Sequence, residues 1–223
     1  MTQKHNNSLG TINMLHRLEK HEIPKASLVL ADAFQNDPLW SKTIGKENEK
    51  GYPVMAEMLL KYCIKYGQIY SPSNNFEGIV ALAQGETSYM TFGRLLKSGG
   101  IIPILKLGFK RLITIANAFT PMDEVRKKHM KDRAFVYIQV IGVSTQHQGK
   151  GFGKKMLNAL IQVSEKTKIP IYLDTETESN VKWYERFGFK TVEQMTLPVI
   201  EQPMWAMKRE PESILTNKKI TED

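Results

Sequence analysis

The chain has 223 residues, 41% of them hydrophobic and 24% charged, which is the composition of a globular protein with a core of ordinary size. Its single cysteine excludes a disulfide framework, and no apolar run approaches the roughly 20 residues that a bilayer-spanning helix needs. The formal charge of +8 permits an anionic partner, but no compact basic block with interleaved aromatic residues indicates nucleic acid.

The first part of the chain alternates between helical and extended patterns. Apolar residues at every second position predict strands, and apolar residues spaced three or four apart predict helices. In chain order we expect a strand over 12–18, a helix from Pro24 to Asp37, a helix over 47–66, and strands over 68–71 and 77–84.

Residues 86–132 predict a helical insertion between two strands. Gly99-Gly100 and Pro121 interrupt it and divide it into short helices over 89–97, 103–119 and 122–131. Within it, the basic cluster Arg126-Lys127-Lys128-His129-Met130-Lys131 predicts a solvated helix face.

The last part of the chain contains a near-continuous apolar run, which indicates a central strand. The elements expected there are a strand over 135–140, a helix over 151–166, a strand over 170–173, a short helix over 180–187, and closing strands over 189–196 and 204–209. This order predicts one domain over 11–209 with a mixed α/β sheet, between flexible tails at 1–10 and 210–223.

A glycine-rich loop joins the central strand to the next helix. Gly149, Gly151 and Gly153 stand at alternate positions, so no Cβ keeps a ligand from the backbone. The first N–H groups of a helix lack intrahelical partners and lie at the positive end of the helix dipole, which favours a phosphate. The triphosphate and dinucleotide loops are excluded, because Lys154 and Met156 occupy the positions where those loops need glycine.

Gln148-Gly149-Lys150-Gly151-Phe152-Gly153 resembles the pyrophosphate loop of the GNAT superfamily of acetyl-CoA-dependent N-acetyltransferases. The resemblance implies a mostly antiparallel sheet of about six to seven strands flanked by helices. It also implies a coenzyme A site formed by Ile141, Gly142, Val143, Gln148, Gly149, Lys150, Gly151, Phe152, Gly153, Lys154, Asn180 and Tyr184. The alternative for the loop alone is a glycine-rich turn before an ordinary amphipathic helix.

A second stretch, from Asn180 to Phe189, resembles the GNAT segment in which a tyrosine protonates the leaving thiolate. Tyr184 holds that position, and a phenol with a pKa of about 10 is protonated at neutral pH. The resemblance gives Asn180 a bond to the pantetheine arm. The alternatives are that Tyr184 packs its helix on the sheet and that Asn180 caps the helix.

The wider pattern resembles the puromycin N-acetyltransferase branch of the superfamily. Its matching segments are 30–38, 147–151, 172–175, 180–189 and 205–207. The resemblance is specific for acetyl-CoA and leaves the acceptor open.

The implied reaction is direct attack of a primary amine on the thioester, which needs a base to take a proton from the amine. Asp174 is the first candidate base and Glu176 the second; both can also be surface carboxylates at a strand end. Backbone N–H groups within 141–143 are expected to stabilise the developing oxyanion, with Gly142 as a bulge that frees them.

Two further side chains are assigned no catalytic role. Cys63 lies in an apolar helical stripe, which predicts an inert core thiol. His147 is expected to be a loop histidine with no role, and the alternative is a contact with a phosphate. No spacing of Cys and His indicates a metal site.

We therefore expect a cytoplasmic acyltransferase that acetylates a small-molecule amine in a ternary complex. Neither nucleic acid nor membrane is expected as a partner, and the protein is expected to be a monomer or homodimer. The alternatives are a non-catalytic acyl-CoA-binding domain, a protein N-acetyltransferase and a nucleic-acid-associated protein.

Overall fold

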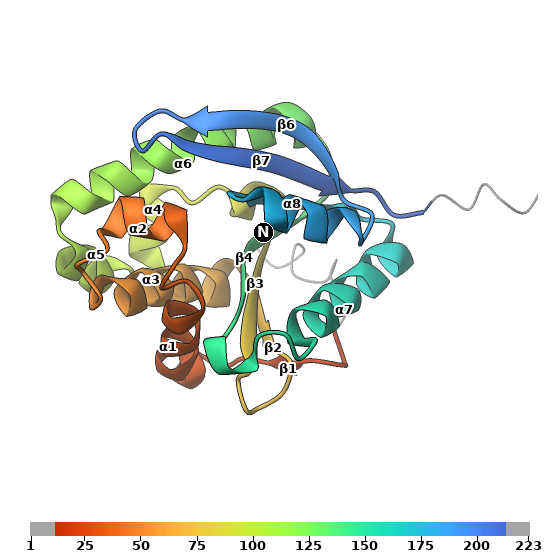
Figure 1. Cartoon of the computed structure of the whole chain (residues 1–223), viewed down its shortest axis with the longest axis horizontal. Helices are drawn as coiled ribbons and strands as arrows, with labels where there is room; N and C mark the ends of the chain where they lie inside the picture. The colour runs from red at the N-terminus through yellow and green to blue at the C-terminus, as the bar shows by residue number, and fades with distance from the viewer. Residues whose placement is uncertain (1–11, 213–223) are drawn as a thin grey trace, which may run out of the picture.

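The computed structural model describes residues 12–212, which form a seven-stranded sheet with helices on both faces (Figure 1). The strand order is β1-β2-β3-β4-β5-β7-β6, and only β4 and β5 run parallel to each other. The predicted tails lie outside the described residues, except for 210–212. The strands are β1 (His16–Arg17), β2 (Gly67–Ser71), β3 (Gly78–Gln84), β4 (Val136–Val143), β5 (Ile171–Thr175), β6 (Lys190–Leu197) and β7 (Gln202–Arg209).

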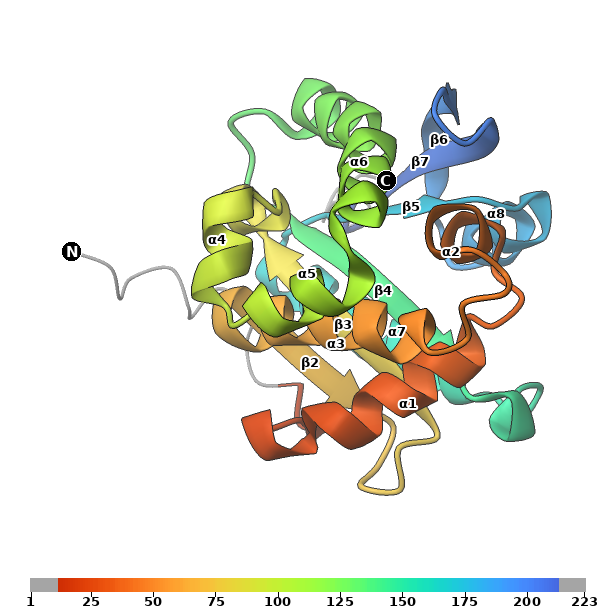
Figure 2. The same ribbon diagram turned by 90° about the vertical axis from the view of Figure 1, so that its left-hand side faces the viewer.

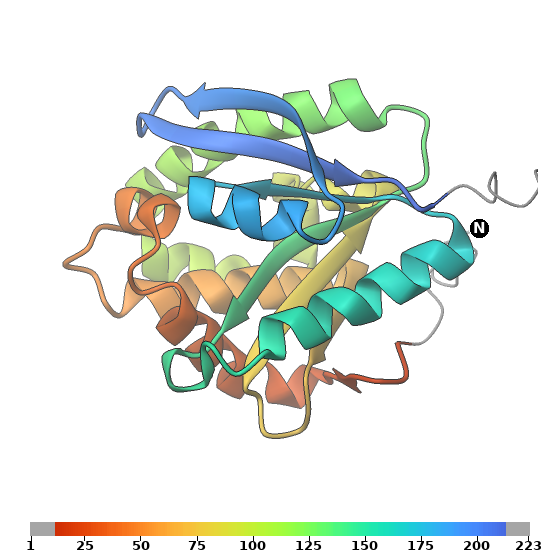
Figure 3. The ribbon, with the colours of Figure 1, turned by 45° about the vertical axis from the view of Figure 1, so that its right-hand side comes forward.

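Six helices lie toward one face of the sheet and two cover the other face, where α7 crosses the strands (Figure 3). The first group is α1 (Ile23–Ala33), α2 (Pro38–Ile44), α3 (Gly51–Tyr66), α4 (Phe92–Lys97), α5 (Ile101–Leu107) and α6 (Phe109–Met130). The second group is α7 (Phe152–Thr167) and α8 (Glu178–Glu185). Short 3-10 turns are η1 (Lys20–Glu22), η2 (Gly85–Ser88) and η3 (Thr145–His147).

Strand β3 shows why both faces are covered. Successive strand residues point to opposite faces, and on β3 both sets are apolar. Ile79 and Ala81 enter the core beneath α1 and α3, whereas Val80 and Leu82 enter the core beneath α7. The predicted fold class, a mixed α/β fold with a mostly antiparallel sheet, is thus confirmed.

The two parallel strands separate soon after they begin. Their pairing consists of Val136 with Ile171 and Tyr137 with Tyr172, although β4 runs on to Val143 and β5 to Thr175. Figure 2 shows β4 leaving β5 at an angle. The edge of β4 beyond Tyr137 therefore has backbone groups that no neighbouring strand uses.

Three expectations about local structure were wrong. The first strand is limited to His16–Arg17, because the N–H of Leu15 bonds to the carbonyl of Ile12 in a turn. A helix, α2, begins at Asp37-Pro38 where only a helix end was expected; the Asp37 carboxylate accepts the N–H of Trp40 and caps it. The three-helix pattern of the insertion was also misplaced, since α6 runs through Pro121 without ending.

Glycine sets the breaks in that insertion. Gly108 has φ of 81° and separates α5 from α6, and Gly99 has φ of 88° between α4 and α5. Pro121 is tolerated because Ala118 and Met122 on either side of it are buried in the core, which holds the helix together across the proline. Within residues 12–212, no helix is both long and apolar enough to cross a membrane.

Candidate active site

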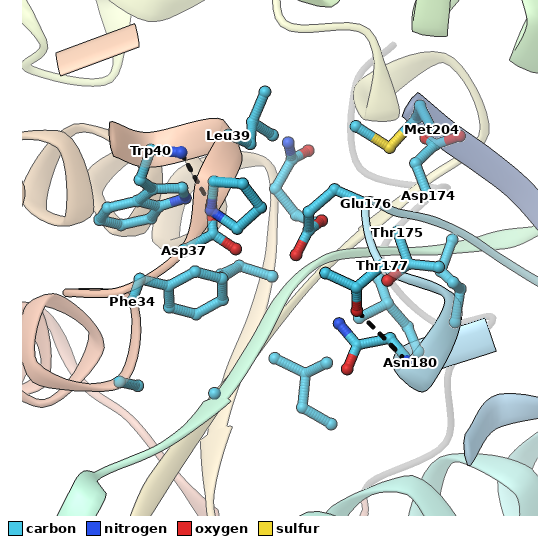
Figure 4. Close-up of a pocket in the computed structure, with 18 of the residues that line it drawn as sticks. Phe34, Asp37, Leu39, Trp40, Asp174, Thr175, Glu176, Thr177, Asn180 and Met204 are labelled. Atoms are coloured by element: carbon cyan, nitrogen blue, oxygen red, sulfur yellow. Dashed lines mark hydrogen bonds between the residues drawn. The ribbon is translucent and has the colours of Figure 1, made fainter. Parts of the chain in front are cut away.

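A cavity of about 460 Å³ occupies the opening between β4 and β5 (Figure 4). Strand β4 forms one wall and the end of β5 with α8 forms the other. The end of α1 and the start of α2 close a third side, and the floor includes Leu59, Phe119 and Met122 of α3 and α6. Segments far apart in the sequence therefore meet in one cleft.

Strand β4 lines the cleft from Tyr137 to Val143. The β3–β4 register shifts opposite Ala81 and Leu82, so the bulge on β4 is at Gln139. The predicted bulge at Gly142 was wrong, because Gly142 pairs in register with Ile79. Close packing explains why position 142 is a glycine. A Cβ there would lie 2.7 Å from the ring of Phe34 and 3.0 Å from Ala33 Cβ, so glycine lets α1 pack on β4.

The glycine-rich loop has the geometry of an anion site. Gly149 and Gly151 have φ of 75° and 84°, values that L-residues with side chains rarely adopt. The first N–H of α7 that reaches back to a carbonyl is that of Lys155, bonded to Gly151 at 2.9 Å. The preceding N–H groups of the helix start are left for a ligand, and the side chains of Lys150 and Lys154 are exposed beside them.

Side chains fix this loop against the sheet. Gln148 Nε2 donates to the carbonyl of Val143 at 3.1 Å, which holds the loop to the end of β4. Asp32 of α1 accepts the N–H of Thr145 at 2.6 Å and its hydroxyl at 2.8 Å. The segment just before the glycine-rich loop is thus held in place by Asp32 of α1. The sequence did not predict this role for Asp32.

Tyr184 and Asn180 line the cleft from α8. The ring of Tyr184 is buried against Trp183 and Phe189, with ring centres 4.9 and 5.5 Å away. Burial, with a smaller contribution from the charge of Glu176, raises the pKa of the Tyr184 phenol. The phenol is therefore protonated over the physiological range. The alternative cap role for Asn180 was wrong, because Thr177 is the cap and accepts the N–H of Asn180 at 3.3 Å.

Two carboxyl groups face each other across the cleft. Glu176 follows β5 and Asp37 precedes α2, and Figure 4 shows their side chains pointing toward one another. Burial and the neighbouring Asp37 charge raise the pKa of Glu176 well above its ordinary value, and burial raises that of Asp37. Both shifts favour one proton shared between the two carboxyl groups at neutral pH.

Asp174 is in a different environment from Glu176. Its side chain is buried, accepts the Tyr137 hydroxyl at 3.0 Å and lies 3.5 Å from a guanidinium nitrogen of Arg126. Burial raises the pKa of Asp174 to about 6, against the lowering effect of Arg126. In Figure 4 it lies near Met204, away from the Asp37–Glu176 pair.

Arg126 was expected on a solvated helix face, and that expectation was wrong. It is buried, bonds to Asp123 and to the carbonyl of Ser88, and lies 4.0 Å over the ring of Tyr137. No sequence pattern indicates this burial, since one helical turn of α6 carries both Arg126 and the exposed Lys127 and Lys128. Arg126 supports Asp174 and Tyr137 from behind the cleft.

The side of the cleft formed by the end of α1 and the start of α2 carries apolar side chains. Phe34 and Trp40 stack with ring centres 4.8 Å apart, and Leu39 lies beside them in the cleft. A second cavity of about 190 Å³ adjoins the first and shares Leu59 and Phe119 with it. This side of the cleft thus combines two carboxyl groups with apolar surface, which suits an amine that has an apolar body.

The predicted burial of Cys63 is confirmed, and His147 packs beside the glycine-rich loop. Cys63 is fully buried, and burial raises the pKa of its thiol to about 12, so it is an inert core residue. His147 Nδ1 lies 2.8 Å from the hydroxyl of Ser144, and its ring packs edge-on against Phe152. Neither side chain lines the cleft.

Comparisons with known proteins agree with this geometry. Residues 104–191 match the family model described as acetyltransferase (GNAT) domain. An uncharacterized N-acetyltransferase of Schizosaccharomyces pombe is 28% identical over 207 residues, which are 88% of this chain and 83% of that protein.

Two solved structures share the fold. One, described as histone acetyltransferase HPA2 and related acetyltransferase from Corynebacterium glutamicum, has a TM-score of 0.64 at 18% identity and covers 90% of this chain and 97% of its own. The other, a Drosophila melanogaster polyamine N-acetyltransferase, has a TM-score of 0.63 at 12% identity and covers 88% and 98%.

The chain has the fold of GNAT acetyltransferases, and residues 104–191 match their family model. It is accordingly an acyltransferase of the N-acetyltransferase type, which transfers acetyl groups to amines. Acetyl-CoA as the donor is implied by that family.

Proposed function

We propose that this protein transfers an acetyl group from acetyl-CoA to the primary amine of a small molecule, by direct attack in a ternary complex. The observation that carries the proposal is one cleft that extends from Gln148, at the start of the glycine-rich loop, to the Asp37–Glu176 pair. An acyl donor and a cationic acceptor can reach the same point from opposite sides.

The residues present fit coenzyme A. The positive-φ glycines at 149 and 151, the N–H groups at the start of α7, and Lys150 with Lys154 suit its pyrophosphate. The unpaired edge of β4 over Ile141–Gly142–Val143 can pair with the amides of the pantetheine arm as an added strand would. Asn180 lies in the same cleft and can bond that arm.

When bound, acetyl-CoA supplies the acetyl group as a thioester. Glu176 and Asp37 receive the acceptor as an ammonium, whose charge lowers the pKa of Glu176 so that the pair releases its shared proton to solvent. Glu176 then takes one proton from the ammonium, and the nitrogen lone pair becomes available. A backbone N–H of β4 within 141–143 donates to the oxygen on which charge develops. As the C–N bond forms and the C–S bond breaks, Tyr184 donates its phenolic proton to the departing sulfur and regains a proton from the acylated nitrogen.

Glu176 is the better candidate base, although the sequence ranked Asp174 first. The Asp174 carboxylate is committed to Tyr137 and Arg126. Glu176 faces the Asp37 carboxyl group; burial and the Asp37 charge raise its pKa, and the charge of an entering ammonium lowers it. We therefore assign proton removal to Glu176 with Asp37, and assign Asp174 to positioning.

A small acceptor is supported by the enclosure of the cleft. Helices α1, α2 and α6 close the acceptor side, and its surface is largely apolar around Phe34, Leu39 and Trp40. The segments around 172–175 and 180–189 are compatible with the puromycin N-acetyltransferase-like branch. The buried, reduced thiol of Cys63 is compatible with a cytoplasmic location.

Acetyl-CoA binding by calorimetry tests the proposal first. Gly151→Glu places a carboxylate at the pyrophosphate position, and we expect binding at least about 100-fold weaker, because juxtaposed like charges cost several kcal/mol. The matched control is Gly85→Glu, which also has positive φ and open space but lies at the far end of β3. An amine screen with free-thiol release as readout then follows.

Two results would contradict the proposal. Absence of acetyl-CoA binding by the unmodified protein would remove the donor site. Binding without thiol release for any primary amine would leave an acyl-CoA-binding protein.

A further inference from the structure

Exposed apolar side chains gather on one part of the molecule. Of the nine large hydrophobic residues exposed within residues 12–212, six belong to α4, α5 and the first turns of α6. We call them the apolar patch: Phe92, Ile101, Ile102, Leu105, Phe109 and Ile113. Figure 2 looks onto this side of the molecule, with α4 and α5 near the viewer.

The apolar patch is not part of the protein core. Helices α4 to α6 already bury a separate set of residues inward, among them Leu95, Leu107 and Ile115. Leu105 and Phe109 are 75% and 76% exposed, more than any other large hydrophobic residue of the described chain. An outward helix face of an ordinary surface helix is polar, so this face indicates a contact with something else.

The charge of the same segment identifies the kind of contact. Residues 87–122 contain no aspartate or glutamate and five basic residues, Arg94, Lys97, Lys106, Lys110 and Arg111. Lys106 and Lys110 are exposed and directly follow Leu105 and Phe109 in the sequence. Exposed apolar side chains and exposed lysines are therefore neighbours along this segment.

We propose that the apolar patch docks this protein on the surface of an anionic lipid bilayer. Leu105, Phe109 and their neighbours enter the boundary between headgroups and acyl chains, while Lys106 and Lys110 bind lipid phosphates and carboxylates. No helix crosses the bilayer in this arrangement. The proposal differs from the sequence-based expectation of no membrane partner, and it does not depend on the acetyltransferase reaction.

A second copy of the chain is a poorer occupant. A two-fold interface places the same patch of both copies face to face, which brings two sets of basic residues together. Residues 87–122 offer no carboxylate to offset that repulsion. An anionic membrane supplies both the apolar phase and the opposite charge.

Vesicle co-sedimentation of the full chain tests the proposal. The probes are vesicles of phosphatidylcholine alone and of an equimolar mixture of phosphatidylcholine and phosphatidylserine. We expect binding to the mixed vesicles at least about tenfold stronger than to phosphatidylcholine, and weaker as salt increases, because each lysine near an anionic surface adds to the affinity.

Two double variants separate the apolar and the ionic contributions. Leu105→Asp with Phe109→Asp should abolish binding to both vesicles, whereas Lys106→Ala with Lys110→Ala should lower binding to the mixed vesicles by about tenfold. The matched control is Leu28→Asp with Val199→Asp, two residues that are also exposed but lie on α1 and in the β6–β7 turn. Circular dichroism and thermal unfolding of every variant verify that it is folded.

Several outcomes would overturn the proposal. The unmodified protein could fail to sediment with the mixed vesicles, or the control variant could lose binding as fully as the patch variant. Sedimentation velocity tests a third outcome, in which the unmodified protein is a dimer and does not bind vesicles. If Leu105→Asp with Phe109→Asp converted that dimer to a monomer, the apolar patch would be an interface between two copies of the chain.

Discussion

The two ends of the cleft are built in different ways. The end assigned to the donor consists of backbone groups from one continuous stretch, the end of β4, the glycine-rich loop and the start of α7. The acceptor end consists of side chains from α1, α2, the end of β5 and α6. Backbone N–H groups can bind the phosphates and amides of an acyl donor whatever the neighbouring side chains are. The specificity for the acceptor depends on side chains.

That difference has a consequence for the energetics. The donor end is held by local geometry, such as the positive φ of Gly149 and Gly151. The acceptor end is held by buried charge, in the Asp37–Glu176 pair and the Asp174–Arg126–Tyr137 network. Single substitutions at the acceptor end should therefore change catalysis and its pH dependence without changing donor binding.

The largest such effect is expected for Glu176→Gln. Loss of the proton acceptor should lower kcat by about 10²–10⁴, while the Kd for acetyl-CoA stays within about twofold, because the change lies outside the loop. Steady-state kinetics and calorimetry measure the two quantities. Asp174→Asn is the comparison variant. If Asp174→Asn lowered kcat by about 10²–10⁴ and Glu176→Gln left kcat unchanged, Asp174 would be the base.

A smaller loss is expected for Tyr184→Phe, which removes the phenolic proton and keeps the ring between Trp183 and Phe189. We expect kcat to fall by about tenfold, because a thiol with a pKa near 8.5 leaves moderately well without a proton. Turnover and the free energy of unfolding should be measured together. An unchanged kcat would reduce Tyr184 to a packing residue.

Asp37→Asn should change the pH profile more than the maximum rate. The Asp37 charge helps to raise the pKa of Glu176, so a neutral side chain lowers that pKa. Because the base acts when ionised, the acid limb of the kcat/KM profile should move to lower pH. A limb that stays in place, or moves to higher pH, would show that the two carboxyl groups do not share a proton.

The smallest effect is expected where the two ends of the cleft meet, at Gly142. Gly142→Ala forces a Cβ to within 2.7 Å of Phe34 and should separate α1 from β4, at a cost of about 1–3 kcal/mol in the free energy of unfolding. Gly153→Ala is the matched control, since its Cβ would lie 3.7 Å from Trp183 and Val143, an ordinary contact. Chemical denaturation measures both; equal stabilities would contradict the proposed packing role.

The sequence by itself determined the parts that depend on local pattern. The order of the main strands, the helix after the glycine-rich loop and the loop itself follow from hydrophobic periodicity and from glycine spacing, which act within a few residues. The position of Cys63 in an apolar stripe likewise predicted its burial, and the structure confirms it. The resemblance to GNAT acetyltransferases rested on the same local stretches.

Only the tertiary structure decided which distant residues meet. Asp37 and Glu176 are separated by most of the chain, and nothing near either residue indicates that β5 and α2 bring their carboxyl groups together. Arg126 looks like its exposed neighbours until the fold places it against Tyr137, Asp174 and Ser88. Long-range packing sets the burial and charge around each group, so it sets the pKa values and contacts on which the proposed chemistry depends.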